Sequence, residues 1–498
     1  MASPFPSSSS VPRRAWLVGL DFGQTRVKAV LVDPDTGDIV RTRSAIPPPR
    51  EAVCTIGSVT YQHLTHPDVL LAAGEALVRD LVPPGPVIPV ALAVSSAGPP
   101  IVAVDRDLNP VWPVVGHWPG ISSDALDDAF PYDPGRFYEE AGSPRWYRPP
   151  IFQLAWLQRH DPVRTEKVAG ILSIGAYIAA RLAGVMAAEP STAGASGALD
   201  RRTRRWSPAL MAAAHLNPAW FPPIVPAGTA LGANHTLLPG RTVTVTTGAH
   251  DYLAAALAAG VDGPDRSLNV LGTWEMAAQF VPIGESGGWG GDEPHEALHD
   301  LHVLPALGSE TLECFTGGQI EWARGILGLD ARAFFAAAAS AGPQAPRGRI
   351  YAPFLGSQFF PHDPPPGGAG FAGLDASVGA AEMARMVLEG LAFLGARMFE
   401  LLEGGRDGTR PALVLTGGAS RGALSGELKA DLLNRPVLVH EMPDLSAVGA
   451  ALLAGVGAGA LESLSHAARL VSGRVRTVEP NAERHERYRA VFDSLQWV

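Results

Sequence analysis

One acidic residue, Asp251, stands where a turn of small residues gives way to an apolar helix-forming run. The stretch Thr246–Gly260 reads T-T-G-A-H-D-Y-L-A-A-A-L-A-A-G. A carboxylate at such a junction lies beside backbone N–H groups that lack partners within the helix. It could accept the proton of a reacting hydroxyl, although an Asp before an Ala/Leu run is most often an N-cap. Asp251 is therefore the candidate catalytic base. Its neighbours His250 and Tyr252 either line a polar substrate pocket or simply pack.

A second group of candidate residues lies in a tight turn near the start of the chain. Two apolar runs predict strands at Trp16–Asp21 and Val27–Val32, joined by a turn around Gly23. A turn of small residues directs several N–H groups to one point, which suits a phosphate, whereas the simpler alternative is a plain hairpin. The candidate phosphate-binding residues are Gly23, Gln24, Thr25 and Lys28. Asp21 is the candidate carboxylate that organises Mg²⁺ through water, because Mg²⁺ keeps several waters in most protein sites.

The same pattern recurs in the second half of the chain. Strands are expected at Ser267–Leu271 and Met276–Val281, around a turn that contains Gly272 and Thr273. Two strand–turn–strand phosphate candidates, one in each half, indicate a duplicated architecture with a cleft between the halves.

A third glycine-rich turn is expected between a strand and a helix. Leu413–Leu415 predicts the strand, Leu424–Leu433 the helix, and Gly417 and Gly418 lie between them. Glycine lets a flat ring or a ribose approach the backbone closely, so this turn is a candidate nucleotide site. Three such turns and one Asp suit phosphoryl transfer, which needs positioning, charge neutralisation and a proton acceptor. The chain lacks the G-x-x-x-x-G-K-[ST] motif, which excludes a P-loop enzyme.

Further elements follow from hydrophobic periodicity and turn residues. Val90–Val94 is expected to be a strand that ends in a loop containing Ser96. The other expectations are a helix at Leu154–Gly184 with a break near Gly170, loops at Gly284–Asp292 and Pro361–Gly370, a helix at Ser377–Leu402 capped by Ser377, a strand at Val437–His440, and a helix at Ala447–Gly457.

A competing motif is H-E-x-x-H, formed by His295, Glu296 and His299, with His302 three residues further on. A zinc hydrolase would need His295 and His299 on one helical face, together with a third ligand. The prolines nearby favour a short strand or loop instead, so loop histidines are the simpler interpretation. The arginine-rich run Arg201–Arg205 is expected to be a solvated loop.

The bulk properties exclude several classes of protein. The chain has 498 residues, 46% hydrophobic and 18% charged, which predicts a soluble protein with at least two domains. A formal net charge of −10 argues against nucleic acid as the main partner. Cys54 and Cys314 are the only cysteines, as expected of the cytoplasm. Residues 1–14 contain four consecutive serines and are expected to be a disordered tail, and no apolar run is long enough to span a membrane.

Taken together, these motifs resemble the FGGY family of carbohydrate kinases over nearly the whole chain after about residue 15. The segments that carry the resemblance are G-L-D-F-G-Q-T-R-V-K-A, G-A-H-D, L-G-T-W-E, Y-A-P-F-L-G-S, G-F-A-G-L, L-T-G-G-A-S and K-A-D-L-L-N-R-P-V. The strength of the resemblance is the order and spacing of these segments.

The resemblance implies an α/β fold of the actin, hexokinase and Hsp70 type, with two ribonuclease-H-like domains and ATP and sugar between them. By match, Thr25, Gly272 and Thr273 would contact the ATP phosphates, and Gly317 would line the nucleotide. Gly417, Gly418 and Gly422 would lie by the adenosine. Asp251 would be the base and Asp21 the carboxylate that organises the metal. The expected division of the chain is residues 15–262 for the sugar side and 263–498 for the nucleotide side.

The sugar-binding segments depart from the family pattern. The loop after the Val90–Val94 strand reads S-S-A-G-P-P, with few side chains besides Ser96 to hold a hydroxyl. The frequent W-x-D-x-R pattern is absent after Trp118, the other candidate in this region. The base and second phosphate segments are similar to the L-fuculose and L-xylulose kinase branches.

The expected function is ATP-dependent phosphorylation of a ketose or deoxyketose at a primary hydroxyl. A linear polyol such as erythritol is the second candidate substrate. A nucleotide-gated sugar-binding or regulatory protein without transfer, and the zinc hydrolase, remain as alternatives. A homodimer is the default expectation for the assembly.

Overall fold

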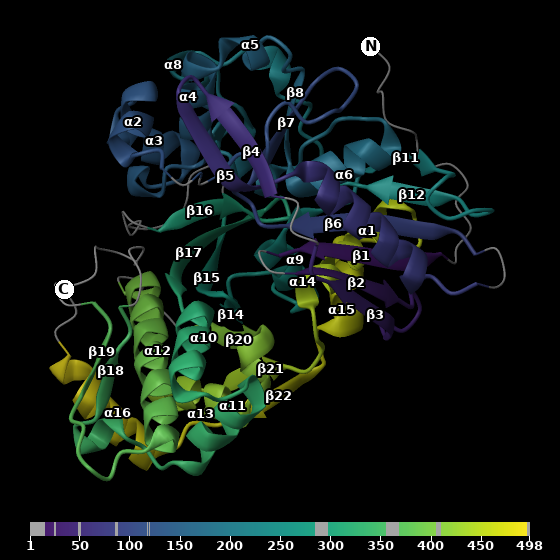
Figure 1. Ribbon diagram of the computed structural model, residues 1–498. Coiled ribbons are helices and arrows are strands. Elements are labelled where there is room, and N and C mark those ends of the chain that lie inside the picture. The colour runs from purple at the N-terminus through teal and green to yellow at the C-terminus, as the bar shows by residue number, and fades with distance from the viewer. Residues whose placement is uncertain are drawn as a thin grey trace.

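The computed structural model describes residues 15–23, 26–47, 51–84, 88–116, 118, 120–283, 297–354, 368–404 and 410–495. Within these ranges the chain forms two mixed β-sheets with helices packed around them (Figure 1). The predictions for residues 1–14, Gln24, Thr25, Gly284–Asp292, His295 and Glu296, and for the first part of Pro361–Gly370, lie outside the described residues.

The first sheet contains both strands of the opening phosphate candidate. Its order is β11 (Ala230–Asn234), β12 (Val243–Thr246), β6 (Val90–Ser96), β1 (Trp16–Phe22), β2 (Val27–Val32) and β3 (Ile39–Ala45), and the short β13 (Ala249–His250) pairs with β6. Strands β12, β6, β1 and β13 are parallel where they pair, while the remaining pairs are antiparallel. The parallel centre is buried on both faces, as its continuous apolar runs require.

The second sheet repeats this topology. Its order is β16 (Leu298–Leu301), β17 (Leu307–Phe315), β15 (Trp274–Pro282), β14 (Arg266–Leu271), β20 (Ala412–Thr416), β21 (Val437–His440) and β22 (Val475–Val478). From β17 to β22 the order and the parallel or antiparallel pairings match those of the first sheet read from β3 to β11. The predicted duplicated α/β architecture is confirmed.

Two helices made largely of small residues join the sheets. Helix α9 (Asp251–Ala258) and helix α14 (Leu445–Gly457) cross each other, and α14 packs on β1 and β6 of the first sheet. A Cβ at Gly449 of α14 would overlap the carbonyl oxygen of Ala254 in α9. A Cβ at Gly19 of β1 would overlap the carbonyl oxygen of Ala447 in α14. Backbone therefore packs directly on backbone at both crossings.

The core around this crossing contains residues from both sheets. Leu17, Val30 and Ala91 come from the first sheet, and Leu268, Ala278 and Val414 from the second. The helix α14 lies near the end of the chain but completes the core of the first half, so the two halves share one apolar interior.

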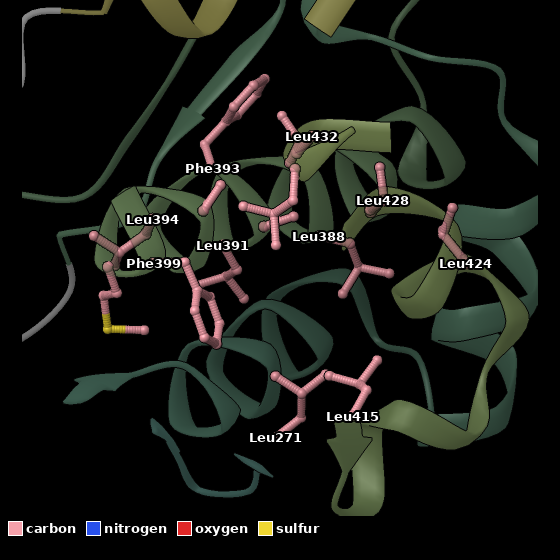
Figure 2. Close-up of a cluster of buried hydrophobic side chains, with 14 of the residues drawn as sticks. Leu271, Leu388, Leu391, Phe393, Leu394, Phe399, Leu415, Leu424, Leu428 and Leu432 are labelled. Carbon is pink, nitrogen blue, oxygen red and sulfur yellow. The ribbon is translucent and has the colours of Figure 1, made fainter. Parts of the chain in front are cut away.

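The long helix of the second half is α12 (Ala380–Glu403), which packs with α13 (Ala423–Leu433) and against β15 and β17. Leu271 of β14 and Leu415 of β20 belong to the same core (Figure 2). The apolar face of α12 follows the predicted spacing, but the predicted cap at Ser377 is wrong. The N-cap is Gly379, whose N–H donates to the Glu382 side chain at 3.0 Å. The Ser377 hydroxyl instead contacts Asp375, because both lie in the turn before the helix.

A third layer of short elements covers the first half at the top of Figure 1. The predicted break near Gly170 is confirmed, because Gly170–Ser173 forms strand β8, which pairs with β7 (Ile101–Val104). The predicted helix before this break is wrong in extent, because Pro162 interrupts it. The helices of this segment are α4 (Pro150–His160), α5 (Pro162–Thr165) and α6 (Ile174–Ala183).

The remaining elements of the first half are β4 (Glu51–Ile56), β5 (Val59–Thr65), α1 (Pro67–Leu81), α2 (Ser123–Ala129), α3 (Pro134–Ala141), η1 (Arg145–Tyr147), α7 (Pro190–Ala195), β9 (Leu199–Asp200), β10 (Arg205–Trp206), α8 (Pro208–Ala213) and η2 (Pro218–Trp220). Those of the second half are α10 (Gly317–Leu327), α11 (Ala331–Ser340), η3 (Ala345–Arg347), β18 (Ile350–Ala352), β19 (Gly370–Ala372), η4 (Gly418–Arg421), α15 (Leu464–Val471) and α16 (Ala482–Ser494). No helix among the described residues is both long and apolar enough to cross a membrane.

We predict that Gly449→Ala destabilises the whole protein by about 1–3 kcal/mol, because overpacked cores lose roughly that much. The matched control is Gly325→Ala in α10, where an added Cβ meets nothing within 4 Å. Alanine should be neutral there or stabilise the helix by about 0.5–1 kcal/mol. Urea unfolding of both variants measures the difference, and equal stabilities would contradict the proposed backbone packing.

Candidate functional site

The candidate base lies at the carboxyl ends of parallel strands of the first sheet. In the strand register, Asp21 of β1 pairs with Ser95 of β6, and Ala249 of β13 pairs with the same serine. Asp251 follows β13 and is the first residue of α9. In open α/β sheets, ligands bind at the carboxyl ends of the strands, so Asp21 and Asp251 occupy the expected edge.

Asp21 and Asp251 differ in their environments. Asp21 is 7% exposed, and its carboxylate accepts a hydrogen bond from the Ser95 hydroxyl at 3.1 Å. Burial, and then the charge of Asp251, raises the pKa of Asp21 to about 7, while Lys28 opposes this rise. The Asp251 side chain is 30% exposed and accepts from the N–H of Tyr252 at 2.7 Å. A buried carboxyl therefore lies beside an accessible one. Lys28 forms an ion pair with Asp444 at 3.0 Å.

The two residues that flank Asp251 have different roles in the structure. His250 places Nε2 at 3.5 Å from Asp251 and Nδ1 at 3.9 Å from a carboxylate oxygen of Asp300. The Tyr252 hydroxyl donates to Asp300 at 2.8 Å and lies 2.7 Å from the Ser309 hydroxyl. Tyr252 is thus buried and joins α9 to β16 and β17 of the second sheet, while His250 lies between the carboxylates of Asp251 and Asp300.

Three residues at this site were not found from the sequence. Burial, and then the charges of Asp300 and Asp251, raises the pKa of Glu313 to about 7. Burial together with the charges of Glu313, Asp300 and Asp251 raises the pKa of Tyr147 well above its ordinary value. Asp300, Glu313 and Tyr147 therefore lie near Asp251, although they come from β16, β17 and η1. The one signal in the sequence was the presence of a charged residue, Asp300 or Glu313, beside apolar residues in a strand.

The second phosphate candidate is built from two segments packed together. The N–H of Gly272 donates to the carbonyl of Trp274 at 3.1 Å, which closes the turn. The N–H of Gly317 donates to the carbonyl of Thr273 at 2.9 Å, and a Cβ at Gly317 would overlap the Gly272 carbonyl. The start of α10 therefore rests directly on the turn. In the first half, the N–H of Gly23 donates to the carbonyl of Arg26 at 3.1 Å.

The third glycine turn combines one tight position with two open ones. Gly417 has a φ of +102°, and a Cβ there would overlap the carbonyl of Leu271, so only glycine fits. At Gly418 and Gly422 an added Cβ meets nothing within 4 Å. The turn is thus fixed against β14 on one side and open on the other, as a nucleotide site requires.

A buried ion pair joins two of the segments that carried the resemblance. Glu275, at the end of the G-T-W-E segment, pairs with Lys429 of α13, and both side chains are 3% exposed. Asn269 donates to the same carboxylate at 3.1 Å. This pair fixes the second phosphate turn to the helix that follows the glycine turn.

Ser96 and Trp118 are both engaged within the protein. The Ser96 hydroxyl is fully buried and accepts from the N–H of Gly175 at 3.2 Å. The Trp118 indole donates to the carbonyl of Val114 at 2.7 Å and packs on Tyr61, 5.5 Å between ring centres. These contacts leave neither side chain a polar group turned toward a substrate, so neither is part of the proposed substrate site.

The described part of the H-E-x-x-H motif is a strand, because His299 lies in β16. Its ring contacts the Tyr138 hydroxyl at 3.1 Å and the guanidinium of Arg201. The expectation of a solvated arginine run is wrong for Arg201, which is 2% exposed and also donates to the carbonyl of Glu139 at 3.0 Å. Among the described residues, no group of three or more His, Cys, Asp or Glu side chains could hold a metal ion.

Comparison with known proteins identifies the family. Residues 16–258 match the N-terminal domain of the FGGY family of carbohydrate kinases, and residues 298–458 match its C-terminal domain. An autoinducer-2 kinase from Klebsiella pneumoniae is 28% identical over 370 residues, which are 70% of this chain and 68% of that protein.

Solved structures agree on the fold. The xylulose kinase from Lactobacillus acidophilus superposes with a TM-score of 0.81 at 20% identity, covering 96% of each chain. The Plasmodium falciparum glycerol kinase with ADP gives a TM-score of 0.79 at 14% identity, covering 97% of each chain. The duplicated sheets are therefore the two domains of the actin-like ATPase fold. The chain belongs to the FGGY family of carbohydrate kinases and is an ATP-dependent carbohydrate kinase.

Proposed function

We propose that this kinase transfers the γ-phosphoryl group of ATP to a primary hydroxyl of a neutral ketose or deoxyketose, with Asp251 as the general base. The observation that carries the proposal is the cluster of acidic side chains around Asp251: His250 lies 3.5 Å from Asp251 and 3.9 Å from Asp300, and Glu313 is on the strand face that contacts α9 through Ser309. Among the described residues, no lysine or arginine forms an ion pair with any of the three.

This cluster favours a neutral acceptor over a sugar acid. A substrate carboxylate would enter a partly buried site that already holds several carboxyl groups, and like charges at short range repel strongly where water is excluded. Hydroxyl groups both donate and accept hydrogen bonds, so they can pair with carboxyl and carboxylate groups alike. Autoinducer-2 kinases, xylulose kinases and a gluconate kinase are all among the similar proteins, so the choice of a neutral acceptor rests on the acidic cluster. L-fuculose, L-xylulose, autoinducer-2 and, second, linear polyols such as erythritol are the candidates to test.

The transfer needs one proton acceptor and several groups that hold phosphate. Asp251 accepts the proton as the hydroxyl oxygen forms its bond to phosphorus and the bond to the ADP oxygen breaks. In this proposal the phosphates lie against the two turns, at Gly23 and Thr25 of the first and Gly272 and Thr273 of the second, with Lys28 at the start of β2. The start of α10 at Gly317 adds the positive end of a helix dipole.

Asp21 fits the role of a residue that organises Mg²⁺. Its carboxyl group is buried, has the Ser95 hydroxyl as a hydrogen-bond partner, and has a raised pKa that a nearby cation would lower. Mg²⁺ is usually held by one or two carboxylates, substrate phosphates and water, so a single carboxylate suffices. The bound ion would neutralise charge on the phosphates.

We predict that Asp251→Asn lowers kcat by about 10²–10⁴-fold, because general-base catalysis contributes that much. ATP binding, measured by calorimetry, should be unchanged. The control is Asp262→Asn, an exposed residue beyond the same helix, which should keep full activity. Full activity of the Asp251 variant would show that another group accepts the proton.

A substrate panel tests the acceptor class. ADP release with Mg-ATP should be high for at least one neutral ketose or deoxyketose and at least about 100-fold lower in kcat/KM for aldonic acids of equal length, since like-charge contacts cost several kcal/mol. The panel contains the candidates above together with aldonates. A preference for an aldonate would refute the neutral-acceptor proposal, and ATP binding without release on any acceptor would favour the non-catalytic alternative.

We predict that Gly418→Leu raises KM for ATP about 10-fold by filling the open space that we assign to the adenosine. KM for the acceptor and the melting temperature should change little, because nothing within 4 Å opposes the new side chain. Gly473→Leu is the matched control, since it is also exposed and open but lies in a loop far along the chain. An unchanged KM for ATP would place the adenosine elsewhere.

A further inference from the structure

Strand β17 directs a row of side chains toward the first half of the protein. Successive side chains of a strand point to opposite faces, so Ser309, Thr311, Glu313 and Phe315 share one face. The register of β17 with β15 is continuous from residue 307 to residue 315, so no bulge interrupts this alternation. The Ser309 hydroxyl lies 2.7 Å from the Tyr252 hydroxyl of α9. This face of β17 therefore turns toward the helix that begins with Asp251.

The other end of the same row reaches the second phosphate turn. The ring of Phe315 packs on Trp274, with 5.4 Å between ring centres, and Trp274 closes the turn at Gly272. A strand rises about 3.3 Å per residue, so Glu313 lies roughly 7 Å along the strand from Phe315 and roughly 13 Å from Ser309. Glu313 thus stands between the phosphate turn and the contact with α9, where the acceptor must lie to meet both.

The carboxyl group of Glu313 has no hydrogen-bond or ion-pair partner among the described residues. Its charged neighbours are the carboxyl groups of Asp300 and Asp251, and Tyr147 faces the same cluster. Glu313 is half-buried, so its carboxyl group is accessible to a ligand while it is partly withdrawn from water. A polar group in this position loses hydration without gaining a partner, and such groups are retained mainly at functional sites. The raised pKa of Glu313, about 7, means that its carboxyl group can donate as well as accept near neutral pH.

We propose that Glu313 determines acceptor specificity by hydrogen-bonding a hydroxyl of the bound sugar other than the one that is phosphorylated. The ligand is a neutral sugar with at least one such hydroxyl. This inference rests on the proposed function, and it adds a residue of the second half to a site whose base comes from the first. Glu313 positions the acceptor and takes no part in the proton transfer.

The test compares Glu313→Ala and Glu313→Gln in the full chain by steady-state kinetics. Alanine should raise KM for the acceptor about 10-fold and leave KM for ATP unchanged, because one hydrogen bond to the substrate is lost. Glutamine should stay within about threefold of the wild type, because its amide also donates and accepts. Glu321→Gln is the control, since Glu321 is an exposed residue of α10 whose side chain is 68% accessible.

A series of acceptors that each lack one hydroxyl separates a direct contact from a structural effect. For one member, the wild type should lose about 10-fold in kcat/KM while Glu313→Ala loses nothing more, as expected when both changes remove the same bond. The inference would be overturned if Glu313→Ala lost as much kcat/KM as the wild type on every member of the series. It would also be overturned if the KM of this variant for the full acceptor stayed within twofold of the wild type. Glu313→Val, which suits a strand, replaces the alanine variant if that protein lacks a cooperative melting transition.

The outcomes also distinguish this inference from the proposed function. A wild-type protein that phosphorylates no neutral sugar would refute both. An active wild type whose alanine and valine variants bind the acceptor equally well would refute only the role of Glu313.

Discussion

The crossing of β1, α9 and α14 without intervening side chains is the constraint on which the site depends. At Gly19 and Gly449 the neighbouring carbonyl oxygens occupy the space of a Cβ, so each contact requires glycine. The crossing fixes where α9 begins and hence where Asp251 lies. It also fixes the start of α14, where Asp444 pairs with Lys28 beside Asp21. Packing in the interior thereby brings charged groups from distant parts of the chain, namely Asp21, Lys28, Asp251 and Asp444, to the carboxyl ends of the strands of the first sheet.

The group of carboxyl side chains at this site, which includes Asp21, Asp251 and Glu313, is electrostatically unfavourable without ligands. The pKa values of Asp21 and Glu313 are raised because burial and neighbouring carboxyl groups oppose ionisation. A site with this arrangement lowers the stability of the fold, and the large shared core offsets that loss. The same arrangement suits the ligands that we propose, namely a cation with its phosphates near Asp21 and hydroxyl groups near Glu313. The loss of stability and the proposed capacity to bind ligands both arise from the same buried, closely spaced carboxyl groups.

The sequence allowed prediction of the parts of the site that depend on local chemistry. Strand–turn–strand patterns and glycine spacing placed Asp21, Gly272 and Gly417 at strand ends, and the apolar run after Asp251 predicted α9. Asp300 and Glu313 were missed because strand register, which no local pattern records, brings them to α9. Strand β8 within Leu154–Gly184 and the buried Arg201 have the same cause, since β8 pairs with β7 and Arg201 contacts His299 of β16. The cap at Ser377 was wrong for a local reason, because Ser377 forms a turn with Asp375 instead.

The site also explains why substrate identity does not follow from the fold. The proposed base belongs to α9 in the first half, whereas Asp300 and Glu313 belong to β16 and β17 in the second. The Tyr252 hydroxyl bonds Asp300 and contacts Ser309, so the two halves are joined by hydrogen bonds immediately beside the base. With the proposed roles of Asp251 and Glu313, alignment of the reacting hydroxyl and selection of the acceptor depend on the same contact. We therefore expect substitutions along one face of β17 to change the acceptor while the turns at Gly23 and Gly272 and the start of α9 stay in place, because backbone packing fixes those.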